Sequence, residues 1–190
     1  MRSRIAVLAL CAVLAACATA PGDGPGNGPG ELRTIPALDL PRYEGTWYEI
    51  AKFPNRFQKQ CLSDTQAVYS AQPDGTVRVL NRCRVAGGAM DEAVGTARQQ
   101  GGPSSPKLKV RFAPAWLSWL PAVWGDYWVV DLDPDYQLSA VSEPRREYLW
   151  VLSRTPRVEP DKYEALLRRL DAQGLDIVRL ERTPQGETER

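Results

Sequence analysis

Apolar and polar side chains alternate along several short segments of the chain. Residues 107–112 place Leu108, Val110 and Phe112 on one face and three cations on the other, which predicts a half-buried strand. Residues 76–85 alternate in the same way, with valines opposite arginines. Further strand patterns cover residues 127–132 and 148–152, which are aromatic and β-branched, and more weakly residues 47–53, 65–71, 89–98 and 137–142.

Turn sequences separate these eight segments. Pro73-Asp74-Gly75, Gly87-Gly88 and Asp133-Pro134-Asp135 combine residue types that favour tight turns. Eight short strands at regular spacing predict an all-β fold, either a sandwich or an eight-stranded antiparallel up-and-down β-barrel.

One helix is predicted after the strands. Pro160 suits a first helical position and Gly174 is placed to end the helix. Residues 176–181 then predict one more short strand. The helix needs an apolar partner for its stripe, and the outer wall of a barrel is the available surface. The stripe consists of Tyr163, Leu166, Leu167 and Leu170.

The chain begins with the features of a secretory signal peptide. Arg2 and Arg4 precede an apolar run over residues 5–14, shorter than the ~20 residues needed to span a bilayer. Leu14-Ala15-Ala16-Cys17 resembles the bacterial lipobox, which implies cleavage after residue 16 and a diacylglycerol on Cys17. We therefore expect residues 1–16 to be a lipoprotein signal peptide; the alternative is an ordinary signal peptide with a chance cysteine.

The segment after the lipobox is expected to be a tether. Every second residue from Pro21 to Gly30 is glycine, and no side chain there is large enough to build a core. We assign residues 17–37 to the lipidated Cys and tether, 38–183 to a β-barrel domain and 184–190 to a polar tail. Ala18 follows the cysteine; by resemblance to sorted lipoproteins this favours anchoring in the cell outer membrane, facing the periplasm.

Composition narrows the possible chemistry. The 190 residues include no histidine, which excludes Ser-His-Asp and Cys-His catalysis, His-bearing zinc sites and His-ligated haem. The formal net charge is +1, with no basic run that would indicate a nucleic-acid partner. We expect no catalytic residue, metal or cofactor, and a binding protein rather than an enzyme.

Three motifs in the domain resemble those of the lipocalin family. Gly45-Thr46-Trp47-Tyr48 matches the first, residues 125–133 leading into Asp135-Tyr136 resemble the second, and residues 148–154 resemble the third, with its closing Arg154. The resemblance covers residues 38–183 and is greatest to the bacterial outer-membrane lipoproteins and the apolipoprotein-D-like group. It implies an eight-stranded antiparallel barrel that is open at one end, with the C-terminal helix packed outside and a short strand following.

The same resemblance assigns structural roles. Trp47 is expected to plug the closed end, with Arg154 across its indole in a cation–π contact. Gly45, Asp135 and Tyr136 complete the structural motif, and none of these residues is expected to bind ligand.

Side-chain parity predicts which residues face the barrel interior. The cations of residues 107–112 cannot face a dry cavity, so the apolar residues between them do. Alignment with the family motifs turns alternate residues of the second and third motifs inward, Leu152 among them. The alternative is that these side chains only fill a core. The predicted ligand-binding residues are Val77, Val79, Leu108, Val110, Phe112, Tyr127, Val129, Tyr148 and Trp150.

A Trp-rich segment, residues 115–124, joins the fifth and sixth predicted strands, a connection that lies at the open end in this family. It contains Trp116, Trp119 and Trp124 and no charged residue. Such an apolar loop is expected to be a lid, a contact with the membrane interface, or a segment packed on the barrel rim.

Cys61 and Cys83 remain after the signal and the lipidated residue are set aside. An even pair in an oxidising envelope favours a disulfide. Counting back from the hairpin turn sets Cys83 opposite Asp64, ~10 Å along the strand from Cys61, so a bridge needs a bulge or a loop that folds back. Two buried thiols and a thiol-based peroxidase are the alternatives.

The leading functional hypothesis is a lipid-anchored lipocalin that carries or stores a small apolar ligand, either a fatty acid or a lysophospholipid. A thiol-dependent lipocalin enzyme acting on a lipid or peroxide and a structural lipoprotein with a filled barrel are the other two hypotheses.

Overall fold

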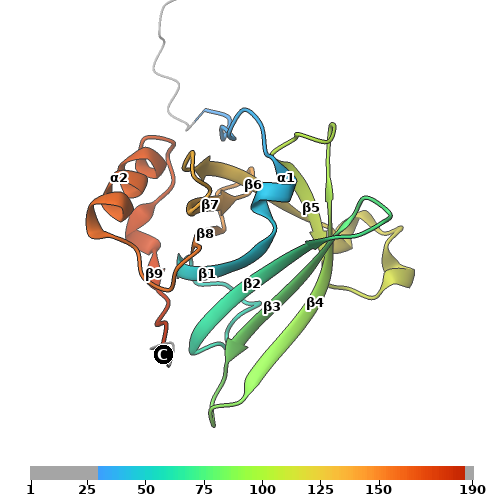
Figure 1. The fold of residues 1–190 in the computed structure, drawn as a ribbon, viewed down its shortest axis with the longest axis horizontal. Helices are drawn as coiled ribbons and strands as arrows, with labels where there is room; N and C mark the ends of the chain where they lie inside the picture. Colours follow the sequence, from blue (N-terminus) through green and yellow to red (C-terminus); the bar gives the residue numbers. More distant parts are fainter. Residues whose placement is uncertain (1–29, 187–190) are drawn as a thin grey trace, which may run out of the picture.

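Eight antiparallel strands close into a barrel in the computed structural model, which describes residues 30–186 (Figure 1). Strands β2 to β8 pair in sequence order, β8 pairs with β1, and β1 pairs with β2 to close the ring. This confirms the eight-stranded up-and-down barrel. The strands are β1 (Gly45–Lys52), β2 (Ser63–Ala71), β3 (Val77–Arg84), β4 (Met90–Gln99), β5 (Lys107–Arg111), β6 (Gly125–Leu132), β7 (Leu138–Ser142) and β8 (Leu149–Ser153).

Strand β1 closes the barrel by changing partners along its length. Trp47 is the register partner of Ala67 in β2, whereas Glu49 is the partner of Leu152 in β8. A bulge between Glu49 and Ala51 interrupts the alternation, so that Ile50 and Ala51 both join the cluster outside the barrel. Glu49, two residues after the inward-facing Trp47, lies on the inner face by ordinary alternation.

A short helix, α1 (Leu40–Tyr43), covers one end of the barrel. The Asp39 carboxylate caps it by accepting a hydrogen bond from the Arg42 backbone N–H at 3.3 Å. The indole N–H of Trp47 donates to the Tyr43 carbonyl at 2.8 Å, and the Trp47 side chain is fully buried. This end is therefore closed, and the open end is formed by the connections β1–β2, β3–β4, β5–β6 and β7–β8.

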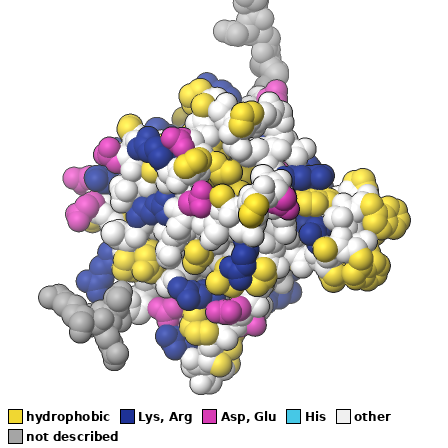
Figure 2. Space-filling view, turned by 45° about the vertical axis from the view of Figure 1, so that its right-hand side comes forward, with side chains coloured by type: hydrophobic (Ala, Val, Ile, Leu, Met, Phe, Trp, Pro, Cys, Tyr) yellow, Lys and Arg dark blue, Asp and Glu magenta, His cyan; other side chains and the backbone are white. Residues whose placement is uncertain are grey.

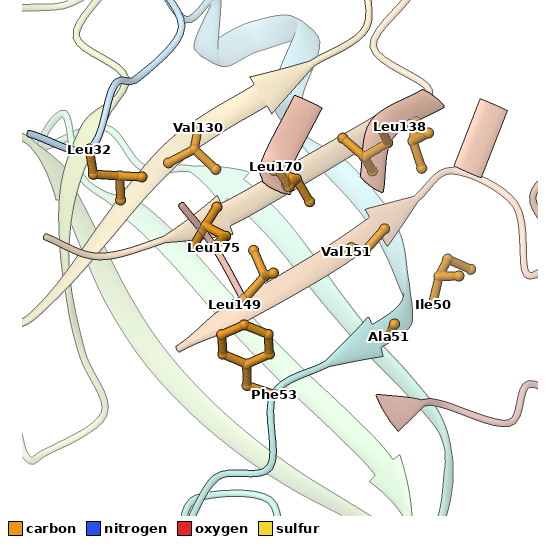
Figure 3. Packing of buried hydrophobic residues seen from close by; sticks show 12 residues of the cluster. Leu32, Ile50, Ala51, Phe53, Val130, Leu138, Leu149, Val151, Leu170 and Leu175 are labelled. Atoms are coloured by element: carbon orange, nitrogen blue, oxygen red, sulfur yellow. The ribbon is translucent and has the colours of Figure 1, made fainter. Parts of the chain in front are cut away.

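A second core lies outside the barrel, under helix α2 (Pro160–Asp171), as expected from its apolar stripe. Leu166 and Leu170 are fully buried there, against the outward faces of β7, β8 and β1. Figure 3 shows Leu149 and Val151 of β8 pointing into this cluster with Leu170. Because neighbouring residues of β8 face opposite sides, the same strand supplies both cores.

The chain after α2 differs in part from the predicted strand over residues 176–181. Residues Ile177–Arg179 form a 3₁₀ turn (η3), and only Glu181–Arg182 form the strand β9, which pairs with Ala51 and Lys52. The turn allows Ile177 and Leu180 to pack against the outer core, which an extended segment with period two would not achieve.

The packed chain also extends beyond the bounds expected for the domain. Leu32 is 2% exposed in the outer core, although the sequence predicts a tether up to residue 37. At the other end, the Gln185 amide donates to the carbonyls of Glu49 and Thr65. Cys17 and the rest of residues 1–29 lie outside the described residues, as do residues 187–190. Within residues 30–186, no helix has the length and apolar character needed to cross a membrane.

Candidate ligand-binding cavity

A cavity of about 840 Å³ occupies the barrel from its open end. Its walls are mostly apolar, and a volume of this size is typical of small-molecule sites. Leu152, expected to face inward, is part of the wall. Eight of the nine predicted ligand-binding residues line it, namely Val77, Val79, Leu108, Val110, Phe112, Tyr127, Tyr148 and Trp150.

Two predicted residues differ from the expectation in detail. Val129 points into the barrel but is fully buried in the packed layer that contains Trp47 and Val141, so its assignment as a cavity residue is corrected. It follows Tyr127 by one inward step toward the closed end, where side chains fill the barrel. Phe112 lies at the rim and is 43% exposed.

Four hydroxyl groups form a connected row toward the closed end of the cavity. The Tyr69 and Tyr127 oxygens are 2.9 Å apart, those of Tyr127 and Tyr43 are 3.2 Å apart, and Tyr43 is 3.1 Å from Ser139. Burial raises the pKa of all three tyrosines, so each phenol stays protonated near neutral pH. Tyr43 and Tyr69 are not among the residues predicted from sequence; the alternation of Thr65, Ala67 and Tyr69 along β2 is the signal that identifies Tyr69.

A polar network fastens the β1–β2 connection to the cavity wall. The Gln58 amide donates to the buried Glu49 carboxylate at 2.6 Å and accepts from the Trp150 indole N–H at 2.9 Å. The Thr183 hydroxyl donates to the other Glu49 oxygen at 2.6 Å, and the Lys52 ammonium lies 3.5 Å from it. A buried carboxylate needs such partners, so the network holds the loop in place beside the mouth.

Arginines and carboxylates surround the mouth. Arg56, Arg82 and Arg145 all border the cavity. The Arg145 guanidinium is paired with Glu147 at 3.0 Å, and Arg82 donates to the Gln66 amide oxygen. The Arg56 guanidinium lies over the Phe57 ring at 5.2 Å, and within residues 30–186 no carboxylate pairs with it.

Cys61 and Cys83 form the expected disulfide, with Cα atoms 5.4 Å apart, at the mouth of the cavity. The spacing difficulty is resolved by a bulge in β2: Ser63 pairs with Arg84, but Gln66 pairs with Arg82. Asp64 takes a left-handed conformation in this bulge, with φ of 55°, and accepts a 2.7 Å hydrogen bond from Arg84. A turn from Gln58 to Cys61 then folds the preceding loop back.

The Trp-rich connection β5–β6 consists of two 3₁₀ turns, η1 (Ala115–Leu117) and η2 (Pro121–Val123). Trp116 and Trp119 are each 74% exposed, and neither lines the cavity. Trp124 does line it, donates its indole N–H to the Ser118 carbonyl, and stacks on Arg98 at 4.1 Å. Figure 2 shows hydrophobic side chains on a projection at the right, where Figure 1 places this connection.

Most of the structural motif is arranged as expected. The Arg154 guanidinium lies 4.0 Å from the Trp47 ring centroid and donates to the carbonyls of Thr46, Tyr136 and Arg42. Gly45 has φ of 91°, which a side chain would strain, and an added Cβ there would approach Arg154 to 3.3 Å.

The second motif is held by a different aspartate from the one predicted. Asp135 is exposed, and its carboxylate has no hydrogen bond or ion pair with another residue of 30–186. Asp133 instead accepts from the backbone N–H groups of Gln137 and Leu138, each at 2.6 Å. Tyr136 takes a left-handed conformation, and its hydroxyl oxygen accepts a hydrogen bond from the Asp39 backbone N–H at the start of α1. The Arg42 guanidinium lies over its ring. Over the same range, no three Cys, Asp or Glu residues are grouped to hold a metal.

Comparisons with known proteins agree with this geometry. The family described as "Lipocalin-like domain" matches residues 38–185. Temperature-induced lipocalin-1 of Arabidopsis thaliana is 43% identical over 160 residues, covering 83% of this chain and 85% of that one. Outer membrane lipoprotein Blc of Escherichia coli K12 is 36% identical over 141 residues, covering 74% and 75%.

A solved structure supports the fold independently. Insecticyanin from the tobacco hornworm Manduca sexta superimposes with a TM-score of 0.63 at 19% identity, over 82% of this chain and 85% of that one. The chain therefore belongs to the lipocalin family, whose members bind small hydrophobic ligands.

Proposed function

We propose that the protein is a lipid-anchored envelope lipocalin that carries or stores a fatty acid or lysophospholipid inside its barrel. The observation that carries this proposal is the open cavity of about 840 Å³ with a mostly apolar wall. Burying an acyl chain contributes ~0.8 kcal/mol per CH₂ before ordering costs, so about a dozen carbons are enough for micromolar affinity.

The polar groups at the mouth favour an amphipathic ligand with an anionic head. Arg56 borders the cavity and has no carboxylate partner within the described chain. A carboxylate or phosphate at the mouth would pair with its guanidinium while the chain stays among Val79, Leu108 and Val110. This arrangement leaves the charged head near water and the tail in the apolar interior.

The disulfide weighs against the thiol-dependent enzyme. A thiolate nucleophile requires a free sulfur, and the sulfurs of Cys61 and Cys83 are bonded to each other. Similarity to relatives named as lipocalins also supports a carrier rather than an enzyme.

Membrane attachment through Cys17 belongs to the same proposal. The lipobox and the 36% identity to a relative named as an outer membrane lipoprotein support lipidation and a place in the outer membrane, facing the periplasm. Residues 1–16 would be removed and the Gly/Pro-rich segment up to Gly30 would space the barrel from the bilayer. Cys17→Ser should leave the protein uncleaved or soluble; unchanged membrane fractionation and acyl labelling would contradict the anchor.

The Trp-rich connection is proposed as a membrane contact rather than a lid. Its two exposed indoles form no part of the cavity wall, and Trp residues favour the bilayer interface. Two guanidinium groups, those of Arg98 and Arg111, lie against Trp124 at the base of the loop. Arg98 is exposed, so its charge favours an anionic lipid surface beside the loop.

A vesicle-transfer experiment tests this contact. The double variant Trp116→Ser, Trp119→Ser should slow uptake of a fluorescent fatty acid from anionic vesicles and leave uptake of the free acid unchanged. Val178→Ser is the matched control, since Val178 is 90% exposed on η3, away from the mouth. Equal loss of rate from vesicles and from solution would instead identify the loop as a gate.

A further inference from the structure

The row of hydroxyls toward the closed end of the cavity has a fixed direction. The Ser139 hydroxyl lies 3.2 Å from the Asp131 carbonyl, which can only accept, so Ser139 donates to it. A hydroxyl has one proton, so Tyr43 must then donate to Ser139. The same argument makes Tyr127 donate to Tyr43 and Tyr69 donate to Tyr127.

All four hydroxyl protons are therefore used within the protein. Burial raises the pKa of each of the three phenols, so none of them ionises near neutral pH. Each phenol therefore keeps its one proton. Tyr69 stands at the end of the row, and its oxygen receives no hydrogen bond from any residue of the described chain. Tyr69 and Tyr127 both line the cavity. The inner end thus offers an acceptor and no donor.

We infer that the inner end of the cavity is a subsite for a hydroxyl group carried near the far end of a long acyl chain. Such a hydroxyl donates to the Tyr69 oxygen. A carboxylate has no proton to donate there and would be buried without a partner, which is strongly unfavourable. The inference rests on the proposed function, and it identifies the ligand class as hydroxylated long-chain fatty acids.

The dimensions of the barrel fit this orientation. Six residues separate Val77 near the inner end from Cys83 at the mouth, which is about 20 Å along a strand and about 15 Å in depth for strands tilted by about 40° to the barrel axis. An extended acyl chain of sixteen carbons is longer than this depth, so it is long enough to place a terminal hydroxyl at Tyr69 and an anionic head at Arg56.

A carboxylate could accept a hydrogen bond at the inner end of the cavity only if every hydroxyl in the row donated in the opposite direction. This reversal requires Ser139 to give up its hydrogen bond to the Asp131 carbonyl and every following hydroxyl to turn. The part-buried Asp131 carbonyl would lose a donor in that arrangement, which disfavours it.

Competition titrations with four sixteen-carbon acids test the inference. Palmitate, 16-hydroxypalmitate, 2-hydroxypalmitate and hexadecanedioate each displace a fluorescent fatty acid from wild type, Tyr69→Phe and the control Tyr163→Phe, whose ring lies outside the barrel. Tyr69→Phe should weaken only 16-hydroxypalmitate, by about five- to tenfold, as expected for one lost hydrogen bond. Unchanged palmitate affinity shows that the variant is folded.

Wild type alone gives a second result that does not depend on the variant folding. Hexadecanedioate, which carries a carboxylate at both ends, should bind at least about tenfold more weakly than 16-hydroxypalmitate. Equal affinities of these two acids, or equal weakening of 16- and 2-hydroxypalmitate by Tyr69→Phe, would overturn the inference. Palmitate binding in the same experiment would still support the proposed carrier function. Failure of all four acids to bind would contradict the carrier itself.

Discussion

Arg154 illustrates how one side chain closes the barrel at the residue scale. Its guanidinium covers the Trp47 ring and donates to three carbonyls, from β1, α1 and the β6–β7 turn. Arg154→Ala should lower the free energy of unfolding by about 2–4 kcal/mol, because it removes the cation–π contact and takes the donor away from three carbonyls, two of them part-buried. Urea denaturation monitored by tryptophan fluorescence measures this loss.

Arg154→Lys is the matched variant, since it keeps the charge but cannot reach three carbonyls from one planar group. We expect its stability to lie between those of wild type and Arg154→Ala. If Lys equals wild type, charge alone accounts for the effect and the three-carbonyl geometry is not needed.

The buried tyrosines set a pH dependence. Burial raises the pKa of Tyr43, Tyr69 and Tyr127 above the ordinary value of 10.0, so the folded chain holds their protons where the unfolded chain releases them. Stability should therefore be fully present below pH 10 and should fall as pH rises beyond it. Denaturation curves at pH 8, 9, 10 and 11 should show this fall, and Tyr127→Phe should reduce its slope; equal slopes would contradict the coupling.

The sequence identifies residues that lie in an alternating pattern or in a family motif. It does not identify features that depend on how the backbone bends. Val77, Val79, Leu108 and Val110 follow from parity alone. Val129 obeys the same parity, but periodicity carries no information on where a cavity ends and packed side chains begin. Asp133 rather than Asp135 holds the β6–β7 turn because its carboxylate reaches two N–H groups, and this depends on the backbone of the turn.

At the scale of elements, the fold is stabilised by the loop that the disulfide closes and by helix α2. The bond joins residues 22 positions apart, so its loss should cost about 3 kcal/mol of stability through the entropy of the unfolded chain. Thermal unfolding of Cys61→Ala, Cys83→Ala against wild type, with and without reductant, measures this difference. Reductant should lower the melting temperature of wild type and leave that of the double variant unchanged; a response of both would indicate another cause.

Helix α2 should contribute to stability without contributing to binding. Leu166 and Leu170 are buried in the outer core, on the far side of β8 from the cavity. Leu166→Ala should reduce the free energy of unfolding by about 2–5 kcal/mol, as for other buried leucines. Titration of a fatty acid at a temperature where the variant is folded should give the wild-type Kd. A changed Kd would show that the two cores are coupled through the strand.

All eight strands and α2 could be predicted from local signals: a period of two or 3.6 residues, aromatic and β-branched composition, and the turn sequences between segments. The elements that could not be predicted depend on tertiary contacts. The β2 bulge at Asp64 is stabilised by Arg84 and by the Gly186 backbone, more than a hundred residues away in sequence. Leu32 stands between the polar residues Glu31, Arg33 and Thr34 and belongs to no periodic pattern, and the outer core under α2 explains its burial.

At the scale of the whole molecule, one barrel combines an apolar interior, a mouth that carries a disulfide and charged side chains, and an exposed apolar loop beside that mouth. The mouth and the Trp-rich connection share Trp124, which lines the cavity and packs on arginines of the outer wall. A bilayer in contact with Trp116 and Trp119 would therefore lie next to the entrance. This arrangement would let a lipid pass between membrane and cavity over a short distance.

The measurement that tests the central claim most directly is a titration of the purified, folded barrel with a fatty acid, compared with Val110→Arg. Val110 lines the cavity, so a guanidinium there would bury a charge in the ligand's place. Leu166→Ala serves as a control for a destabilising substitution outside the cavity. Wild type and Leu166→Ala should bind one equivalent with micromolar Kd, and Val110→Arg should not bind. Absence of saturable binding of any fatty acid or lysophospholipid by folded wild type would contradict the account.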